Sequence, residues 1–135
     1  MILPLNLSPT LKAAKSLATR AALDADTLPG KLMLFAAPRP TEGAAASAPA
    51  LATITLTRPS GTTDSNGFAI TAAAPGQVLT TGDVVWGRFT DGAGNWVMDA
   101  DVGLAAANKP LVIDAVTVYA GGFVSLVTAV LVEGG

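Results

Sequence analysis

The feature that most constrains the fold is a change of hydrophobic period at Gly30. Beyond it, short segments alternate between apolar and polar residues and are separated by Gly, Pro and Asn turns roughly every ten residues. Such alternation is typical of antiparallel strands with one buried face. Because no helical pattern intervenes, the strands fit an antiparallel sandwich, a jelly roll or a small barrel. Of these we expect the antiparallel sandwich or jelly roll, an all-β domain of seven to eight strands with one N-terminal helix.

The expected strands are short and end at turn residues. They span residues 31–36, 52–57, 68–72, 83–89, 96–102, 111–119 and 123–132, with 77–80 as a further strand or an extended connection. The last two contain nearly continuous β-branched runs, which predict burial on both faces.

The N-terminal helix is predicted from Ser8, an N-cap followed by Pro9, to about Asp24. Its apolar residues recur at helical spacing and are mostly small: Leu7, Leu11, Ala14, Ala18 and Ala21, with Leu17 beside them. A helix with so narrow an apolar face would be only marginally stable alone, so we expect it to pack against another surface. We therefore divide the chain into a helical arm and linker, 1–30, and a β domain, 31–135. Met1 to Leu28 are expected to dock on a partner more than to join the core, with Leu7, Leu11 and Leu17 at the interface.

The chain has no cysteine and no histidine among its 135 residues. This composition excludes disulfides, Cys/His zinc sites, thiol nucleophiles and imidazole acid–base catalysis. We expect a protein that is not an enzyme and needs no cofactor.

Charge and hydropathy indicate the kind of partner. Charged residues make up 13% and hydrophobic residues 50% of the chain, and the net charge is −2. No basic surface for nucleic acid or membrane is expected, and the longest apolar stretch is about half of what a membrane helix needs. A small, weakly charged domain usually hides part of its aliphatic surface against another subunit, so we expect a soluble protein made in the cytoplasm that forms a dimer or trimer or joins a larger assembly.

Three aspartates of one predicted hairpin are the strongest chemical candidates. Period two places Asp99 and Asp101 on one strand face, with Trp96 on the opposite face, and Asp91 lies in the turn. A calcium site or an acid–base pair could be built from Asp99 and Asp101, but no calcium-binding loop spacing accompanies them. A solvated face with turn-stabilising aspartates is the favoured interpretation, and no metal is expected.

Two arginines are held in stiff loops by neighbouring prolines. Arg39 lies between two prolines and Arg58 precedes one. Such arginines suit a defined carboxylate on a neighbouring subunit, so both are candidate interface residues, with simple solvation as the alternative.

The run WGRFTDGAGNWVMDADVG, from Trp86 to Gly103, resembles a family of small virion proteins of tailed bacteriophages and prophages. Pro38-Arg39-Pro40-Thr41 matches the turn that follows the first strand in that family, and the similarity extends from about Lys31 to Val132. The chain is also similar to the small jelly-roll cement proteins that decorate capsids. The resemblance implies a virion protein on the capsid surface, made in the host cytoplasm, with the major capsid protein as its partner and no catalytic residues.

Three other functions remain open from the sequence: a tail, neck or baseplate component, a β-sandwich carbohydrate-binding module, and a small hydrolase that uses the aspartates. A sugar-binding module would need exposed aromatic side chains, of which the chain has few, and nothing in the pattern indicates a catalytic cleft.

Overall fold

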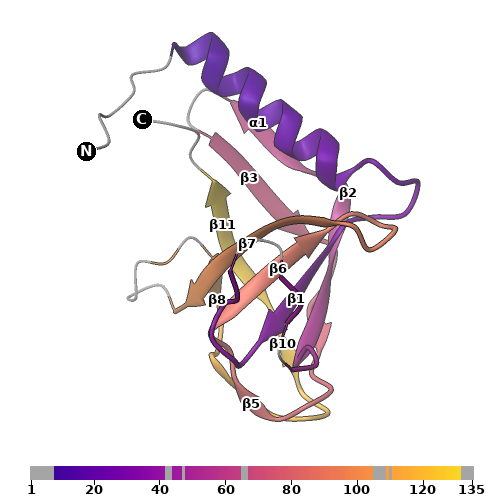
Figure 1. Ribbon diagram of the computed structural model, residues 1–135, viewed down its shortest axis with the longest axis vertical. Coiled ribbons are helices and arrows are strands. Elements are labelled where there is room, and N and C mark those ends of the chain that lie inside the picture. Colours follow the sequence, from indigo (N-terminus) through magenta and orange to yellow (C-terminus); the bar gives the residue numbers. More distant parts are fainter. Residues whose placement is uncertain are drawn as a thin grey trace.

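The computed structural model describes residues 8–41, 44–46, 48–64, 67–104, 109 and 111–131 (Figure 1). One helix precedes a series of short strands. In chain order they are α1 (Pro9–Leu23), β1 (Lys31–Phe35), β2 (Ala52–Asp64), β3 (Gly67–Ala72), β4 (Gly76–Gln77), β5 (Gly82–Asp83), β6 (Trp86–Thr90), β7 (Trp96–Gly103), β8 (Leu111–Ile113), β9 (Thr117–Val118), β10 (Phe123–Val124) and β11 (Leu126–Leu131). None of the described helical segments is long and apolar enough to cross a membrane.

The main sheet closes on itself as a seven-stranded barrel in the order β1-β2-β3-β11-β8-β7-β6. Strand β1 pairs antiparallel with both β2 and β6, and the only parallel pair among the described strands joins β7 to β8. The predicted all-β chain with one N-terminal helix is confirmed, whereas the predicted antiparallel sandwich or jelly roll is wrong. Sandwich and barrel strands both alternate inward and outward residues, so the period could not distinguish them.

The barrel interior is filled by aliphatic side chains and two phenylalanines. Its fully enclosed members include Leu32, Leu34, Ile54, Leu56, Phe68, Phe89, Leu111 and Val124. Gly87 lets these side chains meet across the barrel, because a Cβ there would lie 2.8 Å from a methyl carbon of Leu32. Alternating residues of β1 and β6 therefore point into the core, and the residues between them point outward.

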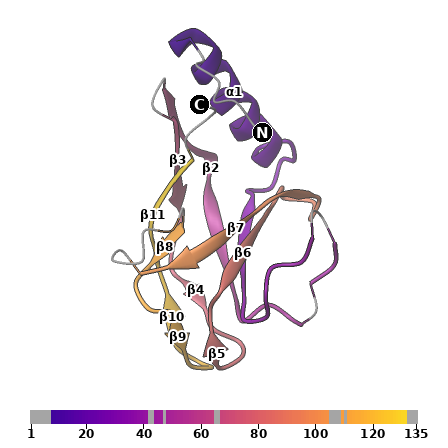
Figure 2. The same cartoon turned by 60° about the vertical axis from the view of Figure 1, so that its left-hand side comes forward.

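Several strands differ in length from the prediction. Strand β2 continues through Arg58-Pro59, where a turn was expected, with a register shift against β3 between Leu56 and Gly61. The predicted strands 83–89, 111–119 and 123–132 are each broken in two. The short pieces pair at one end of the molecule, β5 with β9, and β10 with the separate short strand β4 (Figure 2). The predicted burial of the last strands on both faces is also wrong, since Val127 is exposed.

Helix α1 begins and ends as predicted, with Ser8 Oγ accepting a hydrogen bond from the Leu11 amide at 3.1 Å. It lies across the end of the barrel formed by β2 and β3 (Figures 1 and 2). The face against the barrel contains buried Ser16 and Leu23, the latter part of the core cluster. The expectation that residues up to Leu28 stand apart from the core is therefore wrong for the last helical turn.

The segment after the helix is held against the barrel. Arg58 donates hydrogen bonds to the carbonyl oxygens of Asp24 and Asp26, both at 3.0 Å, and the Ser60 amide donates to the Asp24 carboxylate. Arg20 adds a bond to the Gly61 carbonyl at 3.3 Å. These polar contacts hold the helix against the barrel with its more polar side inward. The segment after the helix is therefore not the flexible linker that its Pro-Gly sequence predicted.

Candidate functional site

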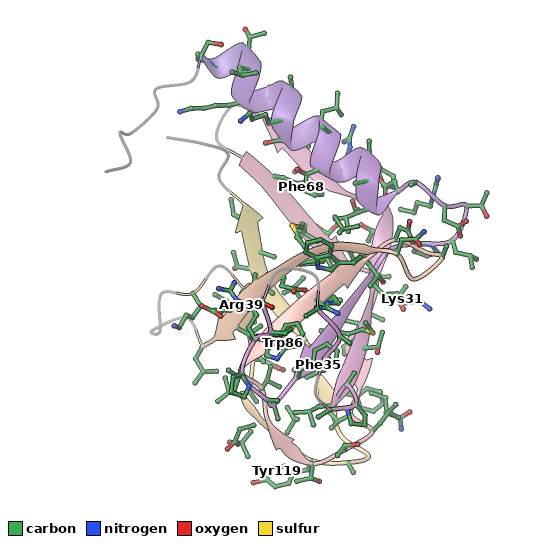
Figure 3. All side chains as sticks on the ribbon, viewed as in Figure 1. Lys31, Phe35, Arg39, Phe68, Trp86 and Tyr119 are labelled. Carbon is green, nitrogen blue, oxygen red and sulfur yellow. The ribbon has the colours of Figure 1, made fainter. Side chains whose placement is uncertain are left out.

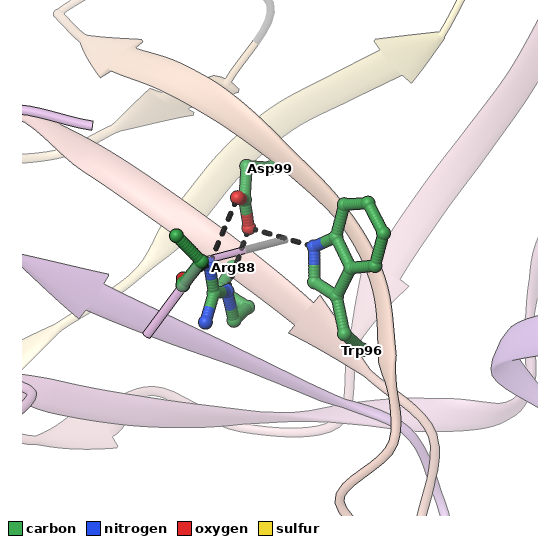
Figure 4. Close-up of polar contacts among 4 residues, drawn as sticks. Arg88, Trp96 and Asp99 are labelled. Atoms are coloured by element: carbon green, nitrogen blue, oxygen red, sulfur yellow. Dashed lines mark hydrogen bonds and ion pairs between the residues drawn. The ribbon is translucent and has the colours of Figure 1, made fainter. Parts of the chain in front are cut away.

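A charged network on the outside of the barrel joins β6 to β7. Arg88 of β6 donates from Nε and Nη2 to the two carboxylate oxygens of Asp99, at 2.8 and 3.0 Å, and both side chains are about nine-tenths buried. Figure 4 shows that the same carboxylate also accepts a hydrogen bond from the indole Nε1 of Trp96, at 3.1 Å. The hydrogen bond to Asp99 raises the pKa of Arg88, so this guanidinium stays charged.

A β-bulge makes this network possible. Phe89 pairs with Met98 and Thr90 pairs with Trp96, so Val97 has no partner in the ladder. The extra residue moves Trp96 to the outward face that Asp99 occupies. The prediction that Trp96 lies on the face opposite Asp99 is therefore wrong, because strict period two holds only in an unbulged strand.

The two tryptophans have opposite environments. Trp86 is fully buried on the outer side of the barrel, where it stacks on Phe35 with a centroid distance of 4.4 Å and lies 5.3 Å from the Arg88 guanidinium carbon (Figure 3). Trp96 is 44% exposed although its ring nitrogen is hydrogen-bonded. The network thus fixes the orientation of an indole that faces solvent.

An open groove of about 490 Å³ lies beside Trp96. It is lined by residues 39–41 of the loop after β1 and by residues 96–99 of β7. Arg39 at its edge forms a loose ion pair with Asp101, at 3.8 Å, and both side chains are nearly half exposed. We call this depression the Trp96 groove.

The three aspartates thus have separate roles. Asp91 closes its own turn, accepting bonds from the Ala93 and Asn95 amides and from the Asn95 side chain, all within 3.0 Å. The side-chain bond from Asn95 is the main reason that the pKa of Asp91 is lowered. The carboxylate of Asp99, a candidate metal ligand, is already held by Arg88 and Trp96. Within the described ranges, no three acidic, His or Cys side chains gather closely enough to bind a metal ion.

The apolar stripe predicted for the helix faces solvent. Leu11 and Leu17 are 43% and 48% exposed, and Ala14, Ala18 and Ala21 are exposed with them. We call these five residues the outer helix face. Leu7, the third predicted interface leucine, is outside the described residues. The side chain of Arg58, another predicted interface residue, donates hydrogen bonds to the linker of its own chain.

The opposite end of the molecule carries a second apolar surface. Leu79, Tyr119 and Phe123 are 65–69% exposed, more than any other large hydrophobic residue that the structure describes. Backbone hydrogen bonds between Val78 and residues 121–122 bring their segments together, and Figure 3 shows Tyr119 at the end farthest from α1. We call these three residues the apolar tip.

Sequence reasoning found the outer helix face but missed the apolar tip and the network. The residues of the apolar tip come from segments that are far apart in the sequence. In the sequence they have the same apolar character as residues buried in a strand. A signal for the turn was present in Ala120-Gly121-Gly122, where Gly121 adopts a φ of 89°.

Comparisons of the chain with protein-family models, with curated proteins and with solved structures found no match.

Proposed function

We propose that this chain is a non-enzymatic structural protein of a bacteriophage virion, a decoration or cement protein that bridges neighbouring subunits of the capsid. The observation that carries the proposal is the placement of exposed apolar side chains at two opposite ends of one small, closed barrel: the outer helix face at one end and the apolar tip at the other (Figures 1 and 3). The sequence resemblance supplies the kind of assembly.

The outer helix face suits docking because its small residues allow a partner to approach closely. Leu11 and Leu17 each keep nearly half of their surface for that partner. Burying a leucine side chain fully contributes about 1.5–3 kcal/mol, so burying the exposed halves of Leu11 and Leu17 against a partner would together contribute roughly as much as one leucine. A single such contact is weak, and a contact at each end lets the first raise the effective concentration of the second.

Charge determines the kind of surface that the helix would meet. Its exposed cation is Lys15, while Lys12 is half-buried and Arg20 is bonded to the barrel, and the helix contains no acidic residue. A coat surface that is apolar with an acidic rim would complement it, whereas pairing with the same helix of a second copy would bring like charges together.

The test is to add the purified protein back to capsids that lack it. We expect the Leu11→Glu/Leu17→Glu variant to bind at least tenfold more weakly, and the Tyr119→Ser/Phe123→Ser variant to be similarly impaired. Val127→Glu is the matched control, because Val127 is exposed but lies on β11 between the two ends. Equal binding by all variants would contradict the proposal.

A tail, neck or baseplate component remains the alternative within the virion, because the same two surfaces would serve it. The copy number per particle separates the two locations. Quantitative mass spectrometry of purified particles should give hundreds of copies for a capsid protein and only a few rings of copies for a tail protein.

A further inference from the structure

The Trp96 groove is a pre-formed surface that the proposed bridging function does not use. It lies on the barrel wall over β7, away from the outer helix face and the apolar tip. Its main apolar element is an indole whose direction is set by a buried carboxylate, Asp99, which is itself held by two hydrogen bonds from Arg88. Because the ring nitrogen is already bonded, the ring is oriented before any ligand arrives, and ordering it costs a ligand little.

The charges around the groove cancel. Arg39 and Arg88 are paired with Asp101 and Asp99, two cations against two anions. A phosphate-bearing or otherwise strongly charged ligand gains nothing from such a balance. The groove therefore fits a neutral molecule with one apolar face and a polar edge.

The edge of the groove offers both donors and acceptors. The Arg39 Nε and Asp101 Oδ1 atoms are 3.8 Å apart, longer than a hydrogen bond, and both side chains are about half exposed. Two neighbouring hydroxyl groups could enter this pair, one accepting from Arg39 and the other donating to Asp101. Thr41 also lines the groove.

We propose that the Trp96 groove binds a neutral saccharide, with a pyranose ring stacked on Trp96 and adjacent hydroxyls held by Arg39 and Asp101. A sugar ring has an apolar C–H face and a rim of hydroxyls, the two features that the groove matches. An extended proline-rich peptide is also neutral, but it docks on grooves lined by several aromatic rings, and Trp96 is the single aromatic residue among the described residues that line this groove.

The two tryptophans make the test direct, because Trp86 is fully buried and Trp96 is exposed. Cellohexaose, maltohexaose and N-acetylchitohexaose are titrated separately up to about 10 mM, so that dissociation constants in the millimolar range are detected. The readouts are tryptophan fluorescence and the indole N–H signals in an ¹⁵N NMR spectrum. We expect at least one saccharide to shift the Trp96 signal saturably and to leave the Trp86 signal in place.

Variants define the site. Trp96→Ala removes the indole reporter, so binding to this variant is followed by the backbone amide signals of the groove residues, whose saturable shifts it should abolish. Arg39→Ala should weaken binding at least threefold with the spectrum otherwise unchanged. Tyr119→Ala, which removes an exposed aromatic ring at the far end, should bind as the wild type does. The proposal is overturned if none of the three saccharides gives a saturable shift of Trp96, if Tyr119→Ala abolishes the binding, or if a proline decapeptide binds in the groove and the saccharides do not. None of these results bears on docking to capsids, which is measured separately.

Discussion

Replacing Asp99 by alanine should destabilise the protein more than any other single change of an acidic side chain that the structure describes. The substitution removes three accepted hydrogen bonds, at 2.8, 3.0 and 3.1 Å, and leaves the Arg88 guanidinium with 11% of its side chain exposed. Its remaining hydrogen-bond acceptor among the described residues is the Ala44 carbonyl oxygen, at 2.7 Å. Breaking one side of a buried ion pair typically costs about 3–5 kcal/mol, because the other charge is left without compensation.

That cost is a large fraction of the free energy of unfolding of a small domain, about 5–15 kcal/mol. Urea unfolding followed by circular dichroism measures it by linear extrapolation. Asp101→Ala is the matched control, two residues along the same strand face. Its half-exposed pair with Arg39 should contribute less than about 1 kcal/mol.

A double variant separates the value of the pair from the cost of breaking it. Arg88→Met/Asp99→Leu removes both charges and keeps the apolar volume, so its stability should lie within roughly 1–2 kcal/mol of the wild type. If Asp99→Ala costs no more than Asp101→Ala, the pair is solvated and the account of an indole fixed by a buried network is refuted.

Three further predictions follow from single contacts. Lowering the pH should reduce stability through Asp91, because folding lowers the pKa of this carboxyl from its ordinary value of 3.8. Its stabilising contribution is complete above that ordinary value and is lost as the pH falls through the lower folded pKa. Thermal unfolding of Asp91→Asn should therefore depend less on acid below about pH 4 than that of the wild type. Ser16→Ala should raise the free energy of unfolding by about 0.5–1 kcal/mol in urea titrations, because the buried Ser16 hydroxyl has no hydrogen-bond partner among the described residues and alanine favours the helix. A decrease of similar size in the free energy of unfolding would show that the hydroxyl is hydrogen-bonded. Sedimentation at micromolar concentration should find a dimer or trimer, given the exposed Leu79, Tyr119 and Phe123 of the apolar tip, and a clean monomer would contradict self-association.

The sequence was most informative where local chemistry decides the structure. Ser8-Pro9 fixed the start of α1, and the Gly30 boundary immediately precedes β1. The sequence left a small barrel open but could not select it, because closure depends on β1 pairing with β6 across more than fifty residues, and an inward-facing leucine has the same pattern in a barrel and in a sandwich.

The orientation of the helix shows a second limit. Amphipathic spacing predicted that Leu11 and Leu17 would be contact residues, but it could not say that the chain's own barrel would take the opposite, more polar face. That choice is made by Arg20, Asp24 and Arg58 through hydrogen bonds to backbone groups, which leave no periodic signal. The Trp96 site was hidden for a similar reason, since one bulged residue reverses the face of every side chain beyond it.

The proposed place of this protein in a virion is tested most directly by a cryo-electron microscopy reconstruction of phage particles to which the purified protein has been added. The account predicts density for the barrel at joints between coat subunits, with the outer helix face on one subunit and Tyr119 and Phe123 of the apolar tip against its neighbour. Density confined to the tail, or a barrel that contacts the shell through its sides with both apolar ends in solvent, would contradict it.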